Sequence, residues 1–170
     1  MTKPANALRE DFLAGMSRAA ATVSVVTTDG PAGRYGVTVS AMTSVSAEGT
    51  APTMLVCVHH QSETAAAILG NGCFCINVLR EDQAAISDVF ARRVPAPGGD
   101  KFNVAPFVAM QSGAPRLADP LVAFDCRLVS GERVGTHHLF IGEVAGVHIG
   151  EGRPLLYGNR AYLKPEPHEG

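Results

Sequence analysis

The sequence predicts a mainly β protein, an antiparallel barrel with a few helices attached to it. Six or seven segments are strand-like, because they alternate or run continuously with β-branched and other apolar residues. Few segments between them have helical spacing, which favours a barrel over a doubly wound sheet. No Gly-x-Gly-x-x-Gly sequence joins a strand to a helix. The chain therefore shows no Rossmann dinucleotide-binding unit.

The first elements are a helix and a pair of strands. Residues 6–20 predict an amphipathic helix that Asn6 could cap, with apolar residues at Leu8, Phe12, Leu13 and Met16. Residues 22–28 are β-branched and alternating, which predicts a strand. A turn at Asp29-Gly30 leads to a return strand over residues 35–45.

The middle of the chain alternates strands with short helices. A nearly continuous apolar strand covers residues 53–59. Residues 62–69 begin with a capping serine and continue with alanines, so we expect a short helix that ends at the glycines after it. Residues 73–79 predict another strand, and residues 81–92 a second short helix.

The last third contains the longest strands. After a Pro- and Gly-rich loop at residues 95–100 and a stretch with a weak signal, residues 121–134 and 138–149 both predict long strands. Gly142 and Gly146 indicate bulges or sharp bends of a closed barrel. A final strand is predicted over residues 155–162.

Composition excludes several classes of protein. The 170 residues suit one domain, 1–170, and they are 46% hydrophobic and 18% charged, as in a globular chain. A formal net charge of −2 gives no reason to expect nucleic acid or an anionic membrane as a partner. No run of about 18 apolar residues predicts a membrane span, and the acidic start argues against a secretory signal. We expect a cytoplasmic protein.

The cysteines and paired histidines do not predict a metal site. The four cysteines, Cys57, Cys73, Cys75 and Cys126, are expected to be reduced thiols, most of them buried in strands. We expect Cys73 and Cys75 to point to opposite faces of one strand, and we expect the same of the adjacent His59 and His60. No third ligand is spaced to complete a site, so the expectation is that no metal is bound.

Three ordered segments resemble a known family. They are Gly36–Ser46 with Pro52–Cys57, then Gly135–Val144, then Pro154–Tyr162. In this order they resemble the flavin reductase family with the FMN-binding split-barrel fold, and the likeness covers about residues 12–163. This resemblance implies an antiparallel, Greek-key split β-barrel with a few flanking helices.

The resemblance also implies an activity and partners. Members reduce FAD or FMN with NADH or NADPH by hydride transfer. Close relatives supply reduced flavin to a separate oxygenase that hydroxylates aromatic compounds. The family implies a homodimer with flavin sites near the subunit interface. The sequence leaves open FAD against FMN, NADH against NADPH, and tight against loose binding of the flavin.

The resemblance assigns residues to the flavin. The ring would lie along small residues that let the backbone approach it, with Cys57 beside them: Thr38, Val39, Ser40, Ala41 and Ser44. The phosphate would lie at a turn that opens a helix, near His59, Gln61, Ser62 and Thr64. Some relatives carry a lysine in this turn that is missing here, which fits a flavin that must leave. Lys101 and Phe102 match a basic-aromatic pair, although Phe102 could equally be a core aromatic.

The resemblance implies that residues of the last two segments bind the nicotinamide nucleotide. His137, in a Gly-x-His motif, is the candidate catalytic residue, and it would position the nicotinamide or supply a proton. Because the two cofactors carry the hydride chemistry themselves, its loss should slow the reaction without abolishing it. Tyr157 could stack on the nucleotide, and Arg160 could hold its phosphates. Arg34, Arg92 and Arg93 are expected to be solvated surface charges.

Two other functions remain open. The chain could be a split-barrel carrier or sensor that holds flavin without turnover. It could also be a β-barrel scaffold with no affinity for flavin.

Overall fold

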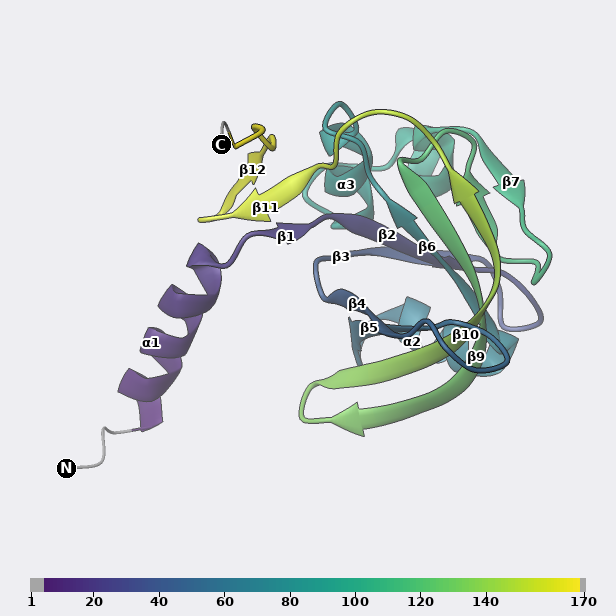
Figure 1. Ribbon diagram of the computed structural model, residues 1–170, viewed down its shortest axis with the longest axis horizontal. Helices are drawn as coiled ribbons and strands as arrows, with labels where there is room; N and C mark the ends of the chain where they lie inside the picture. The colour runs from purple at the N-terminus through teal and green to yellow at the C-terminus, as the bar shows by residue number, and fades with distance from the viewer. Residues whose placement is uncertain (1–4, 169–170) are drawn as a thin grey trace.

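One curled sheet of seven antiparallel strands forms the body. The computed structural model describes residues 5–168, and Figure 1 shows the sheet wrapped into a barrel. The strand order is β3-β2-β6-β9-β10-β5-β4. The bounds are β2 Ser24–Thr28, β3 Tyr35–Val39, β4 Met42–Ser46, β5 Thr53–His59, β6 Cys73–Val78, β9 Val122–Val134 and β10 His137–Ile149.

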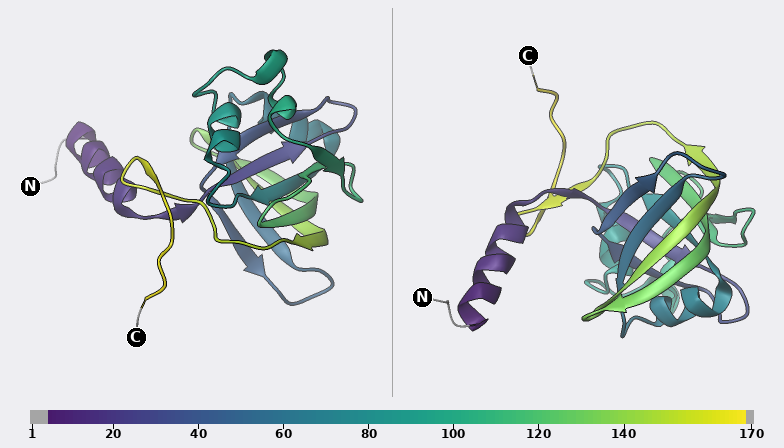
Figure 2. Two further views of the ribbon diagram at one scale, coloured as in Figure 1. Left: turned by 90° about the horizontal axis from the view of Figure 1, so that it is seen from above. Right: turned by 60° about the horizontal axis from the view of Figure 1, so that its bottom comes forward.

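The two edge strands of this sheet follow one another in the chain. Only Ser40 and Ala41 join β3 to β4, although these strands lie at opposite ends of the strand order. The sheet must therefore curl until its edges approach, and Figure 2 shows the resulting barrel. At the join, the amide of Cys57 on β5 donates to the carbonyl of Ala41 at 3.0 Å. The fold class is the predicted one, mainly β and antiparallel.

The central strands are buried on both faces. Every residue of β2 and β6 is buried. β6 is accordingly an almost continuous apolar run, whereas the buried threonines of β2 donate hydrogen bonds to backbone carbonyls. Val26 points into the barrel core with Phe74 and Phe140. Val25, its neighbour, points the other way into a second core outside the barrel wall, which contains Phe90, Phe102 and Leu117.

The long β9–β10 hairpin bends at its glycines. Its register shifts between Ile141 and Gly142 and again between Val144 and Gly146. A Cβ at Gly142 would lie 2.6 Å from Cζ of Phe74, so only glycine fits at this bend. The predicted irregularities at Gly142 and Gly146 are confirmed.

Helices close the barrel end and cover its outer wall. α2 (Glu63–Asn71) begins after Ser62 and ends at Gly72, whose φ of 69° favours glycine. It places Ala65 and Ile68 in the barrel core. α3 (Ala84–Phe90) and the 3-10 turns η1 (Pro97–Gly99) and η2 (Lys101–Val104) cover the second core, beside a small hairpin of β7 (Phe107–Ala109) and β8 (Pro115–Leu117).

The two ends of the chain meet in a second small sheet. Its order is β1-β11-β12, with β1 at Ala21–Thr22, β11 at Leu156–Gly158 and β12 at Ala161–Leu163. The helix before it, α1 (Ala5–Arg18), projects away from the barrel as an arm (Figures 1 and 2). Its predicted apolar residues, Leu8, Phe12, Leu13 and Met16, are all exposed on this arm.

Several predicted boundaries were wrong. The single strand predicted over residues 35–45 is two strands, β3 and β4. The one predicted over residues 155–162 is the hairpin β11–β12, which turns at Asn159 and Arg160 with φ of 49° and 62°. Asn6 lies inside α1 and does not cap it. None of the helices within residues 5–168 is long and apolar enough to cross a membrane.

Candidate functional site

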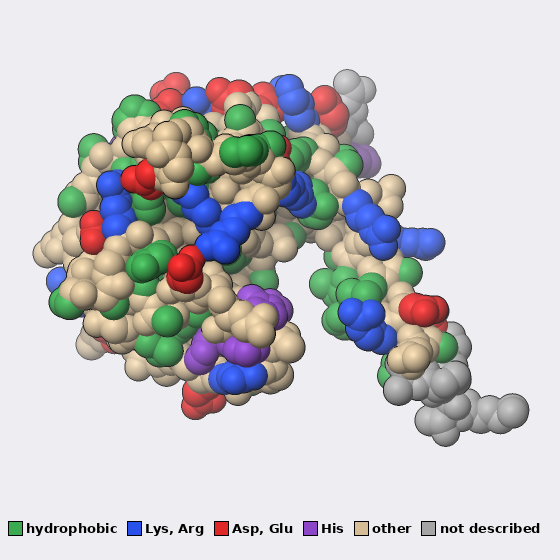
Figure 3. All heavy atoms as spheres, turned by 180° about the vertical axis from the view of Figure 1, so that it is seen from behind, with side chains coloured by type: hydrophobic (Ala, Val, Ile, Leu, Met, Phe, Trp, Pro, Cys, Tyr) green, Lys and Arg blue, Asp and Glu red, His purple; other side chains and the backbone are tan. Residues whose placement is uncertain are grey.

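Three cavities run along β3 and form one groove. The large cavity, about 600 Å³, shares Thr38 and His59 with a middle cavity of about 230 Å³. The middle cavity shares Thr38, Val39 and Ser40 with a small cavity of about 160 Å³. Figure 3 shows the face where Lys and Arg side chains form a band above a group of histidines. The groove therefore combines a strand edge with basic side chains.

The strand edge is available because the barrel is split there. β3 pairs with β2 along one side, and as an edge strand it has no partner on the other. The middle cavity lies between the end of β3, at Val39–Ala41, and residues Cys57–His59 of β5. Unpaired backbone N–H and C=O groups of an edge can hydrogen-bond a planar ligand with polar atoms on its rim. Partial burial raises the pKa of the Cys57 thiol on the opposite wall.

The N-terminus of α2 forms one wall of the large cavity. Ser62 is the N-cap residue, but its side chain makes no capping hydrogen bond. Thr64 lines the cavity and is 2% exposed, and its hydroxyl has no hydrogen-bond partner in the described part of the chain. Two free hydroxyls and the first amides of a helix are donors that suit a phosphate. The donor set thus fits the anionic end of a nucleotide.

Lys101 brings a positive charge to the opposite wall. Its ammonium donates to the carbonyls of Gly36, at 3.3 Å, and Phe90, at 3.1 Å. Burial lowers the pKa of Lys101, and the Arg92 charge lowers it further. An ammonium has three donors, so one remains for a ligand after these two hydrogen bonds.

Phe102 lies between the large cavity and the second core. It lines the large cavity and is also a core residue, 9% exposed. Its ring packs edge-on against Phe90 at 5.3 Å and Phe107 at 4.9 Å between centroids. The Arg34 guanidinium lies over the other side, 4.0 Å from the Phe102 ring centroid.

The histidines gather where β5 ends and β10 begins. His59 and His137 are paired in the sheet register, and their rings meet edge-on at 5.1 Å between centroids. His59 Nδ1 accepts the Gln61 amide at 3.2 Å, so the ring proton of neutral His59 sits on Nε2. His137 Nδ1 lies 3.0 Å from the Thr136 hydroxyl. The ring of His137 is thus oriented on the wall of the middle cavity.

Two expectations about side-chain direction were wrong. Cys73 and Cys75 lie two residues apart on β6, so they share one face of the strand and pack in one small cluster with Ala114 and Ala123. His59 and His60 do not face opposite ways either. Their rings stack with centroids 5.0 Å apart, because the strand ends at His59 and the alternation of side chains ends with it. No group of three His, Cys, Asp or Glu residues within residues 5–168 could hold a metal ion.

A polar cluster closes the small cavity. Arg93 donates to the hydroxyls of Tyr157 and Tyr162 at 3.1 and 3.3 Å. The Tyr162 hydroxyl donates to Asp88 at 2.6 Å and lies 2.9 Å from the Ser87 hydroxyl. Burial and the hydrogen bond to Asp88 raise the pKa of Tyr162. These contacts fix the C-terminal hairpin β11–β12 against α3.

The structure brings most of the predicted residues to this groove. Those that line the large and middle cavities are Thr38, Val39, Ser40, Ala41, Cys57, His59, Gln61, Ser62, Thr64, Lys101, Phe102 and His137. Tyr157 lines the small cavity. Ser44 is exposed on β4, and Arg160 is exposed in the β11–β12 turn; neither lines these three cavities.

Three arginines of the groove were missed. Arg34 and Arg92 line the large cavity and Arg93 the small one, although all three side chains are exposed, as surface charges would be. Each lies just before or after a regular element, where basic residues are common. Only the folded arrangement of β3 and α3 shows that they face one groove.

The chain matches a known protein family over most of its length. Residues 16–165 match the flavin reductase like domain family. A curated relative from Ancylobacter novellus, named FMN reductase (NADH) RutF, is 41% identical over 155 residues, which cover 91% of this chain and 83% of the relative.

Solved structures match over nearly the whole chain. The flavin reductase PheA2 is 29% identical with a TM-score of 0.83, covering 93% of this chain and 98% of PheA2. BorF, the flavin reductase component of a bacterial two-component tryptophan halogenase, is 27% identical with a TM-score of 0.80. That match covers 97% of this chain and 100% of BorF.

Proposed function

The chain belongs to the flavin reductase family, and on that premise we propose that it reduces free flavin with a nicotinamide nucleotide and releases the product. The observation that carries the proposal is the groove itself. Hydrogen-bond donors suited to a phosphate lie at one end, His137 lies at the other, and the unpaired edge of β3 runs between them. Because curated relatives are named FMN reductase (NADH), we propose FMN as the flavin and NADH as the hydride donor. FAD and NADPH would undergo the same chemistry.

The proposed pose places the flavin along β3. The ring lies against the backbone of Thr38–Ala41, where small side chains allow close approach. The phosphate lies at the N-terminus of α2, where Ser62, Thr64 and the charge of Lys101 provide donors. Cys57 forms the opposite wall beside the ring. Flavin supplies an electrophilic N5 that accepts hydride, so the protein's task is to align the nicotinamide C4 with it.

The nicotinamide is proposed to enter from the side of His137. This residue and Tyr157 line the two cavities that flank the end of β3. His137 would hold the nicotinamide in place, with its own ring oriented by Thr136. Arg93, whose guanidinium lies 5.1 Å from the Tyr157 ring centroid, is better placed than Arg160 to hold the nucleotide's phosphates.

We further propose two partners. Reduced flavin would diffuse to a separate oxygenase, as the component structure of the BorF system suggests. A second copy of this chain would cover α1, because an isolated arm with four large exposed apolar residues is marginal in water. The family resemblance names the homodimer, and light scattering after gel filtration tests it, with Phe12→Glu expected to yield monomer. Four free cysteines suit a reducing cytoplasm.

A turnover assay tests the main proposal. The purified chain is mixed with NADH or NADPH and with FMN, FAD or riboflavin, and oxidation is followed by the loss of nicotinamide absorbance. We expect oxidation of the nicotinamide that depends on added flavin and saturates as the flavin concentration rises. We also expect bound flavin to be lost from the protein on gel filtration. A protein that stays yellow through gel filtration and does not oxidise either nucleotide would be a carrier or sensor and would refute the reductase.

A further inference from the structure

A carboxylate occupies the phosphate end of the groove. Glu63 is the first residue of α2, so its charge lies at the helix end that favours anions. It lines the large cavity together with Ser62 and Thr64. A ligand phosphate that used these donors would therefore meet a negative side chain of the protein itself.

The same carboxylate is paired with the best available cation. Arg92 Nη2 donates to Glu63 Oε2 at 2.5 Å, across the mouth of the cavity between α3 and α2. Arg92 also lines the cavity. A guanidinium binds phosphate with two parallel hydrogen bonds, so this pairing withholds a strong phosphate ligand.

The donors deeper in the cavity are free. The buried Thr64 hydroxyl has no hydrogen-bond partner within the described residues, and the Ser62 side chain does not cap the helix. Neither hydroxyl is among the fully buried polar atoms that lack a partner, so both open onto the cavity and can donate to a ligand there.

We propose that Glu63 is an internal competitor for the flavin phosphate and thereby sets a weak flavin affinity. Bound phosphate takes Arg92 from Glu63 and must tolerate the carboxylate beside it. On release of the flavin, Glu63 recaptures Arg92. The inference rests on the proposed function and explains how this site lets its product leave.

The ion pair is weak enough to be exchanged. Both side chains are mostly exposed, at 60% for Glu63 and 70% for Arg92. Exposed pairs contribute little, because water and salt screen them and two long side chains must be ordered. A phosphate carries a charge of about −1.5 to −2 and offers more acceptor atoms than a carboxylate, so it wins Arg92 when flavin is present.

The test measures affinity and not only turnover. Quenching of flavin fluorescence gives the Kd of FMN and of riboflavin, which lacks the phosphate, for the full-length chain and its Glu63→Gln variant. Removing one negative charge beside the phosphate and freeing Arg92 should tighten FMN about tenfold, or roughly 1.4 kcal/mol. Riboflavin should change less than about twofold. Arg92→Gln should weaken FMN and leave riboflavin unchanged.

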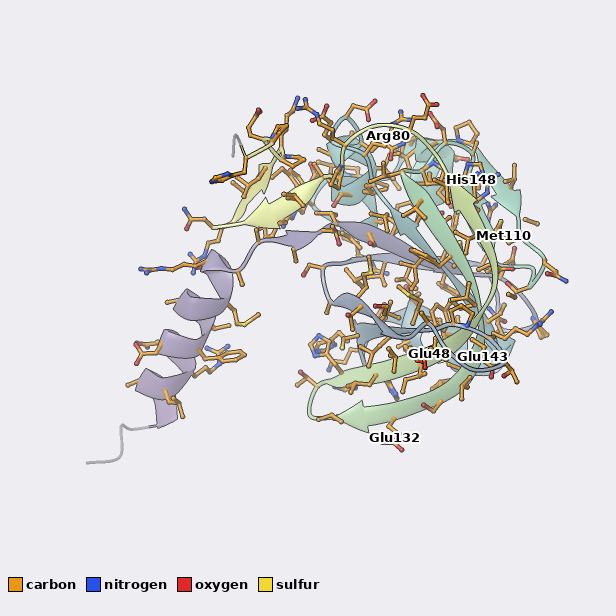
Figure 4. All side chains as sticks on the ribbon, viewed as in Figure 1. Glu48, Arg80, Met110, Glu132, Glu143 and His148 are labelled. Atoms are coloured by element: carbon orange, nitrogen blue, oxygen red, sulfur yellow. The ribbon has the colours of Figure 1, made fainter. Side chains whose placement is uncertain are left out.

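Glu143→Gln is the matched control. Glu143 is exposed and pairs with Thr53 at the start of β5, whereas the groove lies at the other end of that strand, at His59. Figure 4 shows Glu143 away from the arm side of the barrel. This variant changes the net charge equally and should leave both Kd values unchanged.

The outcomes separate this inference from the proposed function. An unchanged or raised FMN Kd in Glu63→Gln, or an equal change for riboflavin, overturns the competitor even if NADH is oxidised. The expected change in Kd without any NADH oxidation upholds the competitor and refutes the reductase. If neither the parent chain nor Glu63→Gln binds FMN measurably, both the competitor and the reductase are refuted. Thermal unfolding of each variant confirms that α2 is intact.

Discussion

The hydrogen bonds of Tyr162 predict that its hydroxyl stabilises the C-terminal hairpin against α3. Tyr162→Phe keeps the ring, which packs against Tyr157 at 5.6 Å between centroids. It removes the 2.6 Å hydrogen bond to Asp88, the 2.9 Å contact with Ser87 and the 3.3 Å hydrogen bond from Arg93. Asp88 keeps only the longer bond of 3.4 Å from Arg93.

The expected cost follows from the charge of the acceptor. A hydrogen bond to a charged group contributes about 1.5–3 kcal/mol, and the site is half-buried, so we expect a loss of roughly 2 kcal/mol. For a chain of this size each kcal/mol shifts the Tm by about 2–4 °C, which gives a fall of roughly 4–8 °C. The same loosening should raise the KM for NADH, because Tyr157 and Arg93 line the adjoining cavity.

Circular dichroism on heating and steady-state kinetics measure the two effects. Tyr35→Phe is the control, since the Tyr35 hydroxyl has no hydrogen bond within residues 5–168, and it should leave the Tm unchanged. A Tyr162→Phe protein with the Tm of the parent would show that the hydroxyl does not fix the hairpin, and the reasoning would fail.

The raised pKa of Tyr162 adds a pH dependence. Its neutral form is favoured in the folded state, so the stabilisation is complete below the unfolded pKa of about 10. It is lost as the pH rises through the folded pKa. The stability gap between the parent and Tyr162→Phe should therefore narrow above about pH 10, and a gap that stays constant to pH 11 would contradict this account.

Three further predictions test the groove. His137→Asn should lower kcat about tenfold without abolishing turnover, as expected for the loss of one contact of roughly 1.4 kcal/mol; complete inactivity would point to obligatory proton transfer. Iodoacetamide labelling followed by mass spectrometry should modify Cys57 ahead of Cys126, whose pKa burial raises to about 12, and flavin should protect Cys57; equal labelling with and without flavin would remove Cys57 from the site. Arg160→Gly should raise the free energy of unfolding by about 0.5–1 kcal/mol, because φ is 62° at this residue and glycine adopts that value without strain. The KM for NADH should stay unchanged. A raised KM would support the nucleotide contact that the sequence predicted for Arg160.

Local pattern predicted the strands but not where one strand becomes two. Residues 35–45 have no Gly or Pro between Val39 and Met42, so alternation alone reads them as continuous. The break occurs because Ser40 and Ala41 carry the chain from one sheet edge to the other. That step is set by barrel closure, a long-range property that no window of residues contains.

The sequence predicted the groove residues that contribute through their backbone. It did not predict those that contribute through the direction of a side chain. The small residues of β3 and the helix start at Ser62 have local sequence signals, and both line the large cavity. Arg92 has none: its φ of 59° turns the chain just after α3 and aims its side chain at Glu63. Such a direction follows from a turn that arginine rarely adopts.

The two-residue connection at Ser40 and Ala41 makes ligand binding depend on complete folding of the barrel. Because the middle cavity lies between β3, at one edge of the sheet, and β5, next to the other edge, a partly assembled chain lacks the complete site. Flavin then binds the finished barrel alone, and mass action stabilises it by roughly 1.4 kcal/mol at ten times the Kd. The cell's pool of free flavin would thus act on the lifetime of this protein as well as on its turnover.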